Sequence, residues 1–542
     1  ASRSIRVYCK GLPTMGAQAA GAEEVEKEAG PELVKADTSD TSILCCSENE
    51  PARVENNEHD QFRWAQFARF VGSGLLASVS YLDPGNLEAD IQIGVHAGMS
   101  LLWWTGICCM VFGFTFQCLA GRLGLVTGQD LAQHLGARLP RHARILLWLL
   151  IEVAIIGADI QETIGCAIAV LVLTNGTVPL AAGCVLVSMT AFALLLLDRV
   201  GFRSIEAIFA AFIGVEAVCM GINFFQAGIP SDKVARGVFV PTLNRQTLPV
   251  AVAALGALVM PYNIYFSSAV VNLRPRGAEG SSVQGKRTLL NYLRLENFLV
   301  LAMAFVINLF VICLFADAFY GTDEEVGLES AADALAERYG NVFRTVWAIG
   351  LLASGQVATI GLTHAGQLVM MGLLNIKVHA GPRMVATRLV ALVPTVTLAV
   401  VFEASHTFDK VAQVLNMVQA LMLPFALIPV IHVAADVGVM GEHFASPKWL
   451  TAFAAGVATI VSAINGYLLV DLTRTEAPDA NAGILAGLGI GIGVYYILVL
   501  YFAVGPENWP AVNERLRQWW AKAYKWLQDN RRRVDFPAMM EA

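Results

Sequence analysis

Charge is scarce in this sequence: Asp, Glu, Lys and Arg make up 15% of its 542 residues, whereas an average soluble domain carries about 25%. Hydrophobic residues make up 56%. Between its apolar runs the sequence lacks any soluble segment long enough to fold separately. It also lacks a P-loop, a His-rich catalytic cluster and a Ser-His-Asp arrangement. These absences exclude a primary pump, disfavour an enzyme and indicate a single domain embedded in a membrane.

A disulfide framework is also absent. Seven of the ten cysteines lie within predicted membrane spans, where a buried cysteine behaves as a small apolar residue. The other three lie in residues 1–60, a polar and Glu-rich segment that we expect to be a disordered cytoplasmic tail. Residues 61–505 form the predicted transmembrane domain. In the cytoplasmic tail, residues 506–542, Trp and basic residues fit either an amphipathic helix on the membrane surface or an ordinary cytoplasmic helix.

Twelve apolar runs have about the 20 residues that are needed to cross a hydrocarbon core. We place them near residues 66–96, 100–120, 146–173, 179–197, 205–227, 247–273, 291–318, 344–371, 385–402, 410–433, 449–470 and 482–504. Most Lys and Arg residues of the connecting loops fall in those that would face the cytosol, with loop 227–247 as a mild exception. By the positive-inside rule we expect a multi-pass protein of a plasma, endosomal or vacuolar membrane, with both termini in the cytoplasm.

Two of these runs are interrupted by the same x-Pro-x-Asn pattern, at Asp83-Pro84-Gly85-Asn86 and at Met260-Pro261-Tyr262-Asn263. Proline has no N–H and clashes with the preceding turn, so each helix must break or kink there. A break inside a bilayer frees backbone groups, which is tolerated only where they line a cavity or bind something. Paired breaks in two halves of a chain therefore indicate inverted repeats with a transporter's binding site between them.

The side chains at the breaks suit a metal ion. Asp83 supplies a carboxylate and Asn86 a neutral oxygen three positions on, and this pair alone would suit a hard ion such as Mg²⁺ or Ca²⁺. Met260 adds a soft thioether, which favours Mn²⁺, Fe²⁺ or Cd²⁺ over the hard ions. The alternative is that Met260 is apolar filler, as most methionines inside membranes are.

These residues resemble the motifs of the Nramp family of divalent-metal transporters, over roughly residues 63–505. The matching motifs follow the family's order along the chain. They are Asp83-Pro84-Gly85-Asn86-Leu87-Glu88-Ala89-Asp90, Asp159-Ile160-Gln161-Glu162, Ala257-Leu258-Val259-Met260-Pro261, Gly355-Gln356, Ala365-Gly366-Gln367, and Gln419 with Leu423-Pro424-Phe425-Ala426-Leu427-Ile428-Pro429.

The resemblance implies an all-α integral membrane protein with the LeuT-type fold. That fold has two inverted five-helix repeats, here near residues 63–228 and 246–434, and two further helices near 449–504. The resemblance also implies proton-coupled transport of Mn²⁺ or Fe²⁺ toward the cytosol, by alternating access around unwound helices 1 and 6. It adds the carbonyl of Ala257 and, in an occluded state, the side chain of Gln419 to the ligands of the metal.

The transported ion is the expected substrate, and no cofactor is expected. The expected partners are this metal ion and membrane lipids, without nucleic acid. We expect the protein to be a monomer.

The third span carries three carboxylates, Glu152, Asp159 and Glu162, spaced by seven and three residues. At about 100° per residue they fall on one face of the helix. Carboxylates along one face inside a membrane mark a water-filled or protonatable path, so we predict a proton pathway that joins these three residues to Asp83. Arg388 is the natural counter-charge, and the resemblance places it beside this path. A static network of ion pairs is the alternative.

One departure from the family pattern bears on coupling. Where the family usually has His directly after Met-Pro, and often a second His five residues later, this sequence has Tyr262 and Ser267. Histidine titrates near neutral pH and tyrosine does not, so the metal ligands stay intact while an uncoupled carrier becomes an alternative. A divergent carrier of Mg²⁺ or Al³⁺ is a second alternative. A receptor or sensor with a transporter fold is a third, which the short tails disfavour.

Overall fold

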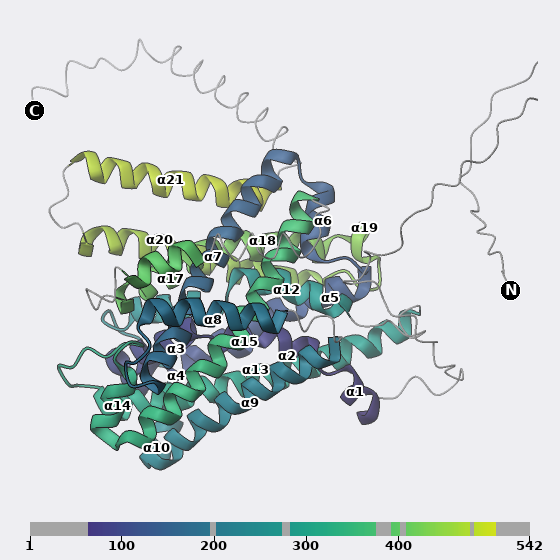
Figure 1. The fold of residues 1–542 in the computed structure, drawn as a ribbon. Coiled ribbons are helices and arrows are strands. Elements are labelled where there is room, and N and C mark those ends of the chain that lie inside the picture. The colour runs from purple at the N-terminus through teal and green to yellow at the C-terminus, as the bar shows by residue number, and fades with distance from the viewer. Residues whose placement is uncertain are drawn as a thin grey trace, which may run out of the picture. The chain divides into compact units, whose positions relative to one another are not determined.

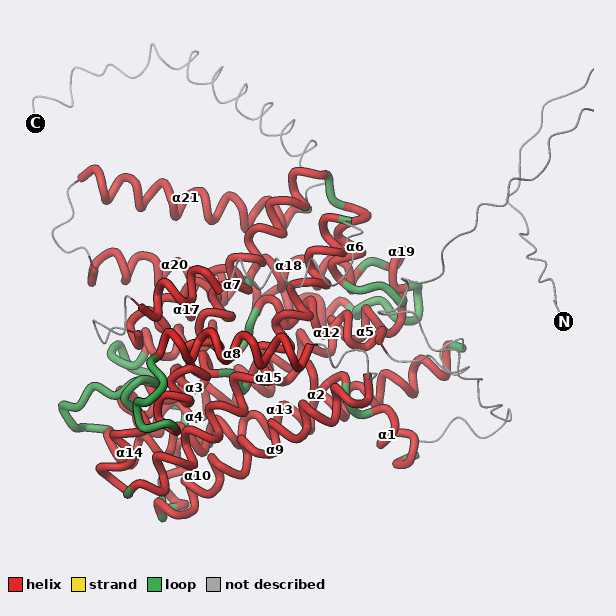
Figure 2. The backbone as a smooth tube through the Cα atoms, in the orientation of Figure 1, coloured by secondary structure: helices red, strands yellow, loops and turns green. Residues whose placement is uncertain are grey.

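The computed structural model describes residues 63–195, 202–273, 282–375, 392–400, 408–476 and 482–505. These residues belong to one compact unit, residues 46–542. Within the described ranges the chain is helical and contains no β-strand (Figure 2). The predicted tails, residues 1–60 and 506–542, lie outside these ranges, and so do Arg388 and half of the predicted span 385–402.

The first half of the chain forms a series of helices in which short 3₁₀ and π segments join longer α-helices. They are α1 (Trp64–Phe70), α2 (Ser73–Ser78), the 3₁₀ segment η1 (Val79–Tyr81), α3 (Pro84–Ala97), the 3₁₀ segment η2 (Gly98–Leu101), α4 (Leu102–Ile107), the π-helical η3 (Cys108–Gly113), α5 (Phe114–Thr127), α6 (Leu131–Arg138), α7 (Arg141–Leu173), α8 (Leu180–Leu195) and α9 (Phe202–Ala227).

The second half continues the all-helical pattern. Its described helices are α10 (Ser231–Phe239), α11 (Leu248–Leu258), α12 (Pro261–Val270), the 3₁₀ segment η5 (Val271–Leu273), α13 (Val283–Phe319), α14 (Ala331–Tyr339), α15 (Asn341–Leu374), α17 (Phe408–Met422), α18 (Pro424–Ala435), α19 (Val437–Met440), α20 (Lys448–Glu476) and α21 (Ala482–Val504).

Helices long and apolar enough to cross a membrane recur along the chain. Among the described residues, seven helical stretches meet that requirement, and two shorter apolar helices accompany them. One of the seven, Pro84–Thr127, contains part of the first predicted span and all of the second. The helix α7, which carries the acidic stripe, has 33 residues and measures about 50 Å. The count of twelve spans stays a prediction.

The helices that carry the predicted site residues pack against one another. The helix α3 contacts α11, α13 and α17, and α7 contacts α8, α15 and α17. The helix α9 runs beside α13 and α15, and α12 lies among α5, α15 and α18 (Figure 1).

Large apolar side chains occur both inside this bundle and on its outside. Trp347 and Tyr265 are fully buried, whereas Leu149, Met189 and Ile490 are exposed. In water such exposure would be unfavourable, but lipid tails accept apolar side chains freely, so hydropathy does not mark the buried face of these helices.

Candidate metal site at two helix breaks

The first break lies between η1 and α3. The chain leaves the helical conformation at Leu82, and α3 starts again at Pro84 with Asp83 as its N-cap residue, in an extended conformation. Proline suits the first turn of a helix because its missing N–H would have no partner there. The Asp-Pro pair of the sequence therefore both ends one helical segment and starts the next.

Three carbonyls of the break lack the regular helical donor, and side chains satisfy them instead. The pairs are Asn86 Nδ2 to Ser80 O at 2.9 Å, Asn308 Nδ2 to Tyr81 O at 3.2 Å, and the Ser354 hydroxyl to Leu82 O. Because two of these donors come from α13 and α15, the unwound segment is held by the bundle around it.

Asp83 and Asn86 each keep one oxygen without a hydrogen-bond donor. Asp83 Oδ1 accepts bonds from the backbone N–H of Asn86 at 2.8 Å and from its Nδ2 at 3.0 Å. Asp83 Oδ2 and Asn86 Oδ1 are buried and have no hydrogen-bond partner, and both residues are fully buried. Buried polar atoms are normally satisfied, so two buried oxygens without donors on residues three positions apart are candidate ligands for a cation.

The second break separates α11 from α12. Val259 ends α11, and Met260 is the N-cap residue of α12 with φ −79° and ψ 135°. In a continuous helix the carbonyl of Ala257 would accept from the N–H of residue 261, but Pro261 has none. The Ala257 carbonyl therefore loses its regular partner, while Met260 is 1% exposed. A buried carbonyl oxygen and a buried sulfur are thus placed three residues apart.

The packing of the two broken helices brings both breaks into one region. The helix α11 contacts both η1 and α3, and α17 contacts α3, α11 and α12. A metal site built from both breaks and from α17 is consistent with this arrangement.

Gln419 of α17 is held by Gln161, a residue to which the sequence alone assigned no role. Its Nε2 donates to Gln161 Oε1 at 2.6 Å, and its own Oε1 is buried without a partner. Gln161 Nε2 in turn donates to Asn416 Oδ1 at 2.8 Å, and Asn416 Nδ2 donates to Gly85 O at 3.2 Å. A chain of amides therefore links α7 and α17 to the first break. The only sequence signal for Gln161 was its place in a family motif.

The amide chain approaches Gly85 closely. A Cβ atom on Gly85 would lie 3.0 Å from Gln161 Oε1 and 3.2 Å from Asp83 Oδ1. Both distances are tighter than ordinary contacts between such atoms. The predicted ligand Asp83 and the amide of Gln161 therefore both lie close to the place that a side chain at position 85 would enter.

Comparison with known proteins identifies the family. The family model of natural resistance-associated macrophage protein-like (Nramp) chains matches residues 74–471. The chain is 38% identical over 472 residues to the metal transporter nramp1 homolog of Dictyostelium discoideum, with 86% of each chain covered. It is 40% identical over 456 residues to the metal transporter Nramp6 of Oryza sativa subsp. japonica, with 83% of each covered. The chain belongs to the Nramp family.

A solved Nramp-type structure confirms the fold. The chain matches the Eremococcus coleocola manganese transporter, crystallised with an aromatic bis-isothiourea substituted compound, with a TM-score of 0.72 and 25% identity. The match covers 86% of this chain and 98% of that one. The predicted family and the all-helical, LeuT-type membrane fold are therefore confirmed, and membership of a transporter family confirms that the chain is not an enzyme.

The acidic stripe of this Nramp chain lies on α7 as predicted, but its members differ in burial. Asp159 and Glu162 are buried, whereas Glu152 is only partly buried. Tyr262, which follows the Met-Pro of the second break, interacts electrostatically with Glu162, Asp83 and Asp159. The structure thus gathers two of the three stripe carboxylates around the two breaks, and places Glu152 about three turns away from Glu162 along α7.

The second position at which this chain departs from the family pattern also faces polar groups. Ser267 is buried on α12, and its hydroxyl donates to Asn263 Oδ1 at 3.4 Å. Tyr262 is itself 3% exposed. Both departures therefore lie inside the bundle, Tyr262 directly after the Met-Pro of the second break and Ser267 five residues further along α12.

The donors at the breaks are of mixed chemistry. Among the described residues, no three His, Cys, Asp or Glu side chains gather in a way that could hold a metal ion. A site at the breaks would contain one carboxylate, with amide and carbonyl oxygens and a thioether as the other donors. Such a shell carries less negative charge than a site built to keep its ion.

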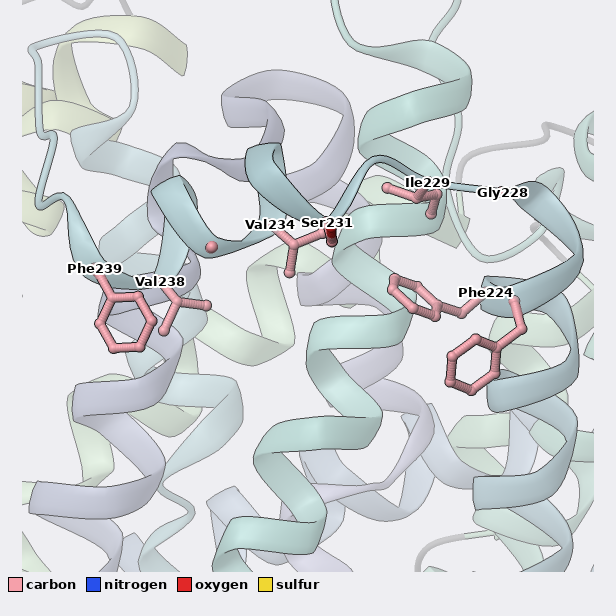
Figure 3. Close-up of a pocket in the computed structure, with 9 residues that line it drawn as sticks. Phe224, Gly228, Ile229, Ser231, Val234, Val238 and Phe239 are labelled. Carbon is pink, nitrogen blue, oxygen red and sulfur yellow. The ribbon is translucent and has the colours of Figure 1, made fainter.

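A pocket of about 410 Å³ lies elsewhere, between the end of α9 and α10 (Figure 3). Its lining is almost entirely apolar and offers no metal ligands. The lining residues are Phe224, Phe225, Gly228, Ile229, Ser231, Val234, Ala235, Val238 and Phe239. This pocket is therefore not part of the candidate site.

Proposed function

We propose that this chain transports divalent transition-metal ions, Mn²⁺ and Fe²⁺ first among them and Cd²⁺ as a further substrate, across a membrane toward the cytosol. The observation that carries the proposal is the pair of orphaned oxygens, Asp83 Oδ2 and Asn86 Oδ1, in a fully buried helix break. A cation between them would satisfy both oxygens at once. The relatives named above are metal transporters, and the matching solved structure is a manganese transporter.

The proposed ligand set explains why the site would release its ion. Asp83 would supply the one negative charge, and Asn86, the Ala257 carbonyl and Gln419 would supply neutral oxygens. A transporter must bind its substrate weakly enough to release it, and a shell of one carboxylate and neutral donors meets that need. Alternating access would follow from movement of the half-helices, because each break already separates two helical segments.

Met260 favours transition metals over the hard ions in this proposal. A thioether contributes little to Mg²⁺ or Ca²⁺ but is an acceptable ligand for softer divalent ions. Its position as N-cap residue of α12, buried at the second break, supports direct contact with the ion. The carrier of a harder ion, Mg²⁺ or Al³⁺, is the less favoured candidate because of this sulfur.

We further propose that transport is coupled to protons through Asp83, Asp159, Glu162 and Glu152. The support is the clustering of Asp159 and Glu162 near Asp83 around Tyr262. Carboxylates can exchange protons without a histidine, so the presence of Tyr262 does not prevent coupling. Arg388, which lies outside the described residues, would restrain the charge of this path. The uncoupled carrier is the alternative, favoured by Tyr262 and Ser267.

A flux assay in proteoliposomes tests the proposal. The full chain is reconstituted, and uptake of Mn²⁺, Mg²⁺ and Ca²⁺ is followed with an internal metal dye and an internal pH dye together. We expect uptake of Mn²⁺ well above that of Mg²⁺ and Ca²⁺, and its loss in Asp83→Asn. Asp232→Asn, an exposed carboxylate of α10, is the matched control and should transport like the wild type. Full Mn²⁺ uptake by Asp83→Asn would refute the site.

A further inference from the structure

Two buried carboxylates lie outside the site and outside the α7 stripe. Glu216, in the middle of α9, and Asp90, in α3, are both 0% exposed. All four of their carboxylate oxygens lack a hydrogen-bond partner. A buried ionised carboxylate without partners is strongly unfavourable, so this pair needs a proton or a cation.

The packing of α9 against α15 fixes the level of Glu216 along the bundle. Phe209 of α9 lies beside Gly361 of α15, where a Cβ would be 3.7 Å from the ring, and Met220 lies beside Gly350. The two helices therefore run antiparallel. Glu216 comes seven residues after Phe209. In the antiparallel pair it therefore lies at the level of the α15 residue seven positions before Gly361, which is residue 354.

That level is occupied by Ser354 of α15, which is hydrogen-bonded to the first helix break. The Ser354 hydroxyl donates to the carbonyl of Leu82, the residue directly before Asp83. Glu216 therefore lies at the level of the unwound segment, on a helix that contacts α15, whereas Asp83 caps α3, which contacts α11 and α17. The two carboxylates approach the same break from different helices.

The charges that face Glu216 are of one sign. It interacts electrostatically with Asp83 and Asp90, and the thiol of Cys219 on its own helix is a further neighbour. Like charges in a buried region cannot all be ionised unless a cation is present. A divalent ion at the first break would be such a cation.

Among the described residues of α2, α13 and α15, which pack on α9, no cationic side chain lies at the level of Glu216. The segment α2 has no titratable side chain, and α15 has Arg344 and His364, each about three turns from Ser354. The charged side chains of α13 lie toward its two ends; they are Lys286, Arg287, Arg294, Glu296 and Asp317. Glu296 there accepts hydrogen bonds from Gly72 and Gly74 at the start of α2.

We propose that Glu216, assisted by Asp90, holds a proton that leaves when a divalent ion occupies the Asp83 site. The inference rests on the proposed function. The O–H bond of the carboxylic acid breaks, its electron pair stays on the carboxylate, and the proton passes to water. The two positive charges of the ion then compensate the new negative charge. This proton site lies on the α9 side of the break, apart from the α7 stripe.

Proton release on metal binding tests the inference. Mn²⁺ is titrated into the purified full chain in two buffers of different ionisation enthalpy, and calorimetry gives the protons released per bound ion. We expect the wild type to release about one proton. Glu216→Gln keeps the shape and removes the acid, so it should bind Mn²⁺ and release less than about half as many protons.

The same helix offers a matched control. Glu206 of α9 is also buried, but it is paired with Arg203 at 2.7 Å, so Glu206→Gln should release protons like the wild type. Asp90→Asn is the second variant, with a reduced release expected, if Glu216→Gln proves unstable. Undiminished release in the Glu216 and Asp90 variants would overturn the inference and leave the proposed function standing. Absence of Mn²⁺ binding by the wild type would overturn the proposed function itself.

Discussion

At the scale of single residues, the proposed metal site depends on a few side-chain atoms of Asp83 and Asn86. Both residues form hydrogen bonds within the break itself, since the amide of Asn86 donates both to Asp83 and to the carbonyl of Ser80. The remaining oxygens, Asp83 Oδ2 and Asn86 Oδ1, are left facing no donor. One residue pair therefore serves both as the cap of α3 and as the proposed start of a metal shell.

Met260→Ala should relax selectivity more than it weakens Mn²⁺ transport. Without the sulfur the shell contains oxygen only, and the preference over Ca²⁺ and Mg²⁺ falls. Cd²⁺, the softest of the expected substrates, should lose about tenfold or more in affinity. Calorimetry with Cd²⁺ and Mn²⁺ on the purified variant measures this. Equal Cd²⁺ affinity in variant and wild type would show that Met260 is apolar filler.

Gln161→Ala should weaken Mn²⁺ binding although Gln161 is not a proposed ligand. Its Oε1 holds the amide of Gln419, and loss of such an orienting bond costs about 10–100-fold in metal affinity. Gln413→Ala, on the same helix as Gln419 but only partly buried, is the control and should bind normally. The double variant of Gln161 and Gln419 should lose less than the sum of the single losses, because both act through one bond. Additive losses of affinity would show that Gln161 and Gln419 act independently and would contradict this prediction.

At the scale of secondary-structure elements, helix ends need polar partners. Proline starts α3, α12 and α18, and the N-cap residues of α3 and α6 are aspartates that accept from the backbone. Inside a membrane a helix end exposes N–H and C=O groups to a medium that cannot satisfy them. Side chains such as Asn308 and Ser354 therefore come from neighbouring helices to close the first break.

Asp130, the N-cap of α6, lies outside the apolar spans and gives a prediction about pH. Burial raises its pKa from 3.8 to about 6, although bonds from backbone N–H groups act in the opposite direction. Because the folded state holds the proton more tightly than the unfolded state, stability falls as pH rises from about 4 to about 6.

Asp130→Asn should therefore raise the thermal midpoint in detergent at pH 7 and remove this pH dependence. Asparagine keeps the cap, which includes the bond to the N–H of Gln133 at 2.8 Å, and carries no charge to bury. Thermal unfolding of wild type and variant from pH 4 to pH 8 provides the measurement. A variant less stable than wild type at pH 7 would contradict the argument.

At the scale of the whole molecule, contacts between distant parts of the chain build the candidate site. Asn416 reaches Gly85, 331 residues away, and Gln419 reaches Gln161, 258 residues away. The first break is in turn held by α13 and α15, and Tyr262 of the second lies near carboxylates of α3 and α7. Movement of any one of these helices would change the site, as alternating access requires.

Coupling of metal transport to proton transport is a property of the whole molecule, because it links carboxylates on several helices. We expect Mn²⁺ uptake by the wild type to acidify the liposome interior. Glu162→Gln or Asp159→Asn should weaken that acidification and its pH dependence while Mn²⁺ binding at Asp83 persists. The internal pH and metal dyes, read together, measure the ratio of protons to metal. Mn²⁺ uptake without acidification in the wild type would make the protein a facilitated carrier and the stripe a set of structural ion pairs.

The sequence by itself determined the broken helices, because proline acts locally: Pro84 and Pro261 lack the N–H that a continuous helix needs there. It also determined the membrane class, the family and the acidic stripe of α7, since length, hydropathy and helical period are properties of a single segment. The motif order further identified the LeuT-type fold by resemblance. Arg388 and the number of spans stay predictions.

Only the tertiary structure decided which polar groups meet. Gln161 became part of the site through its bond to Gln419, and the packing of α9 on α15 brought Glu216 to the level of the first break. Neither could be recognised beforehand, because a polar side chain in an apolar helix gives no signal of which distant residue it will face. In a membrane the apolar face toward lipid resembles the apolar face toward protein, so hydropathy could not orient these helices either.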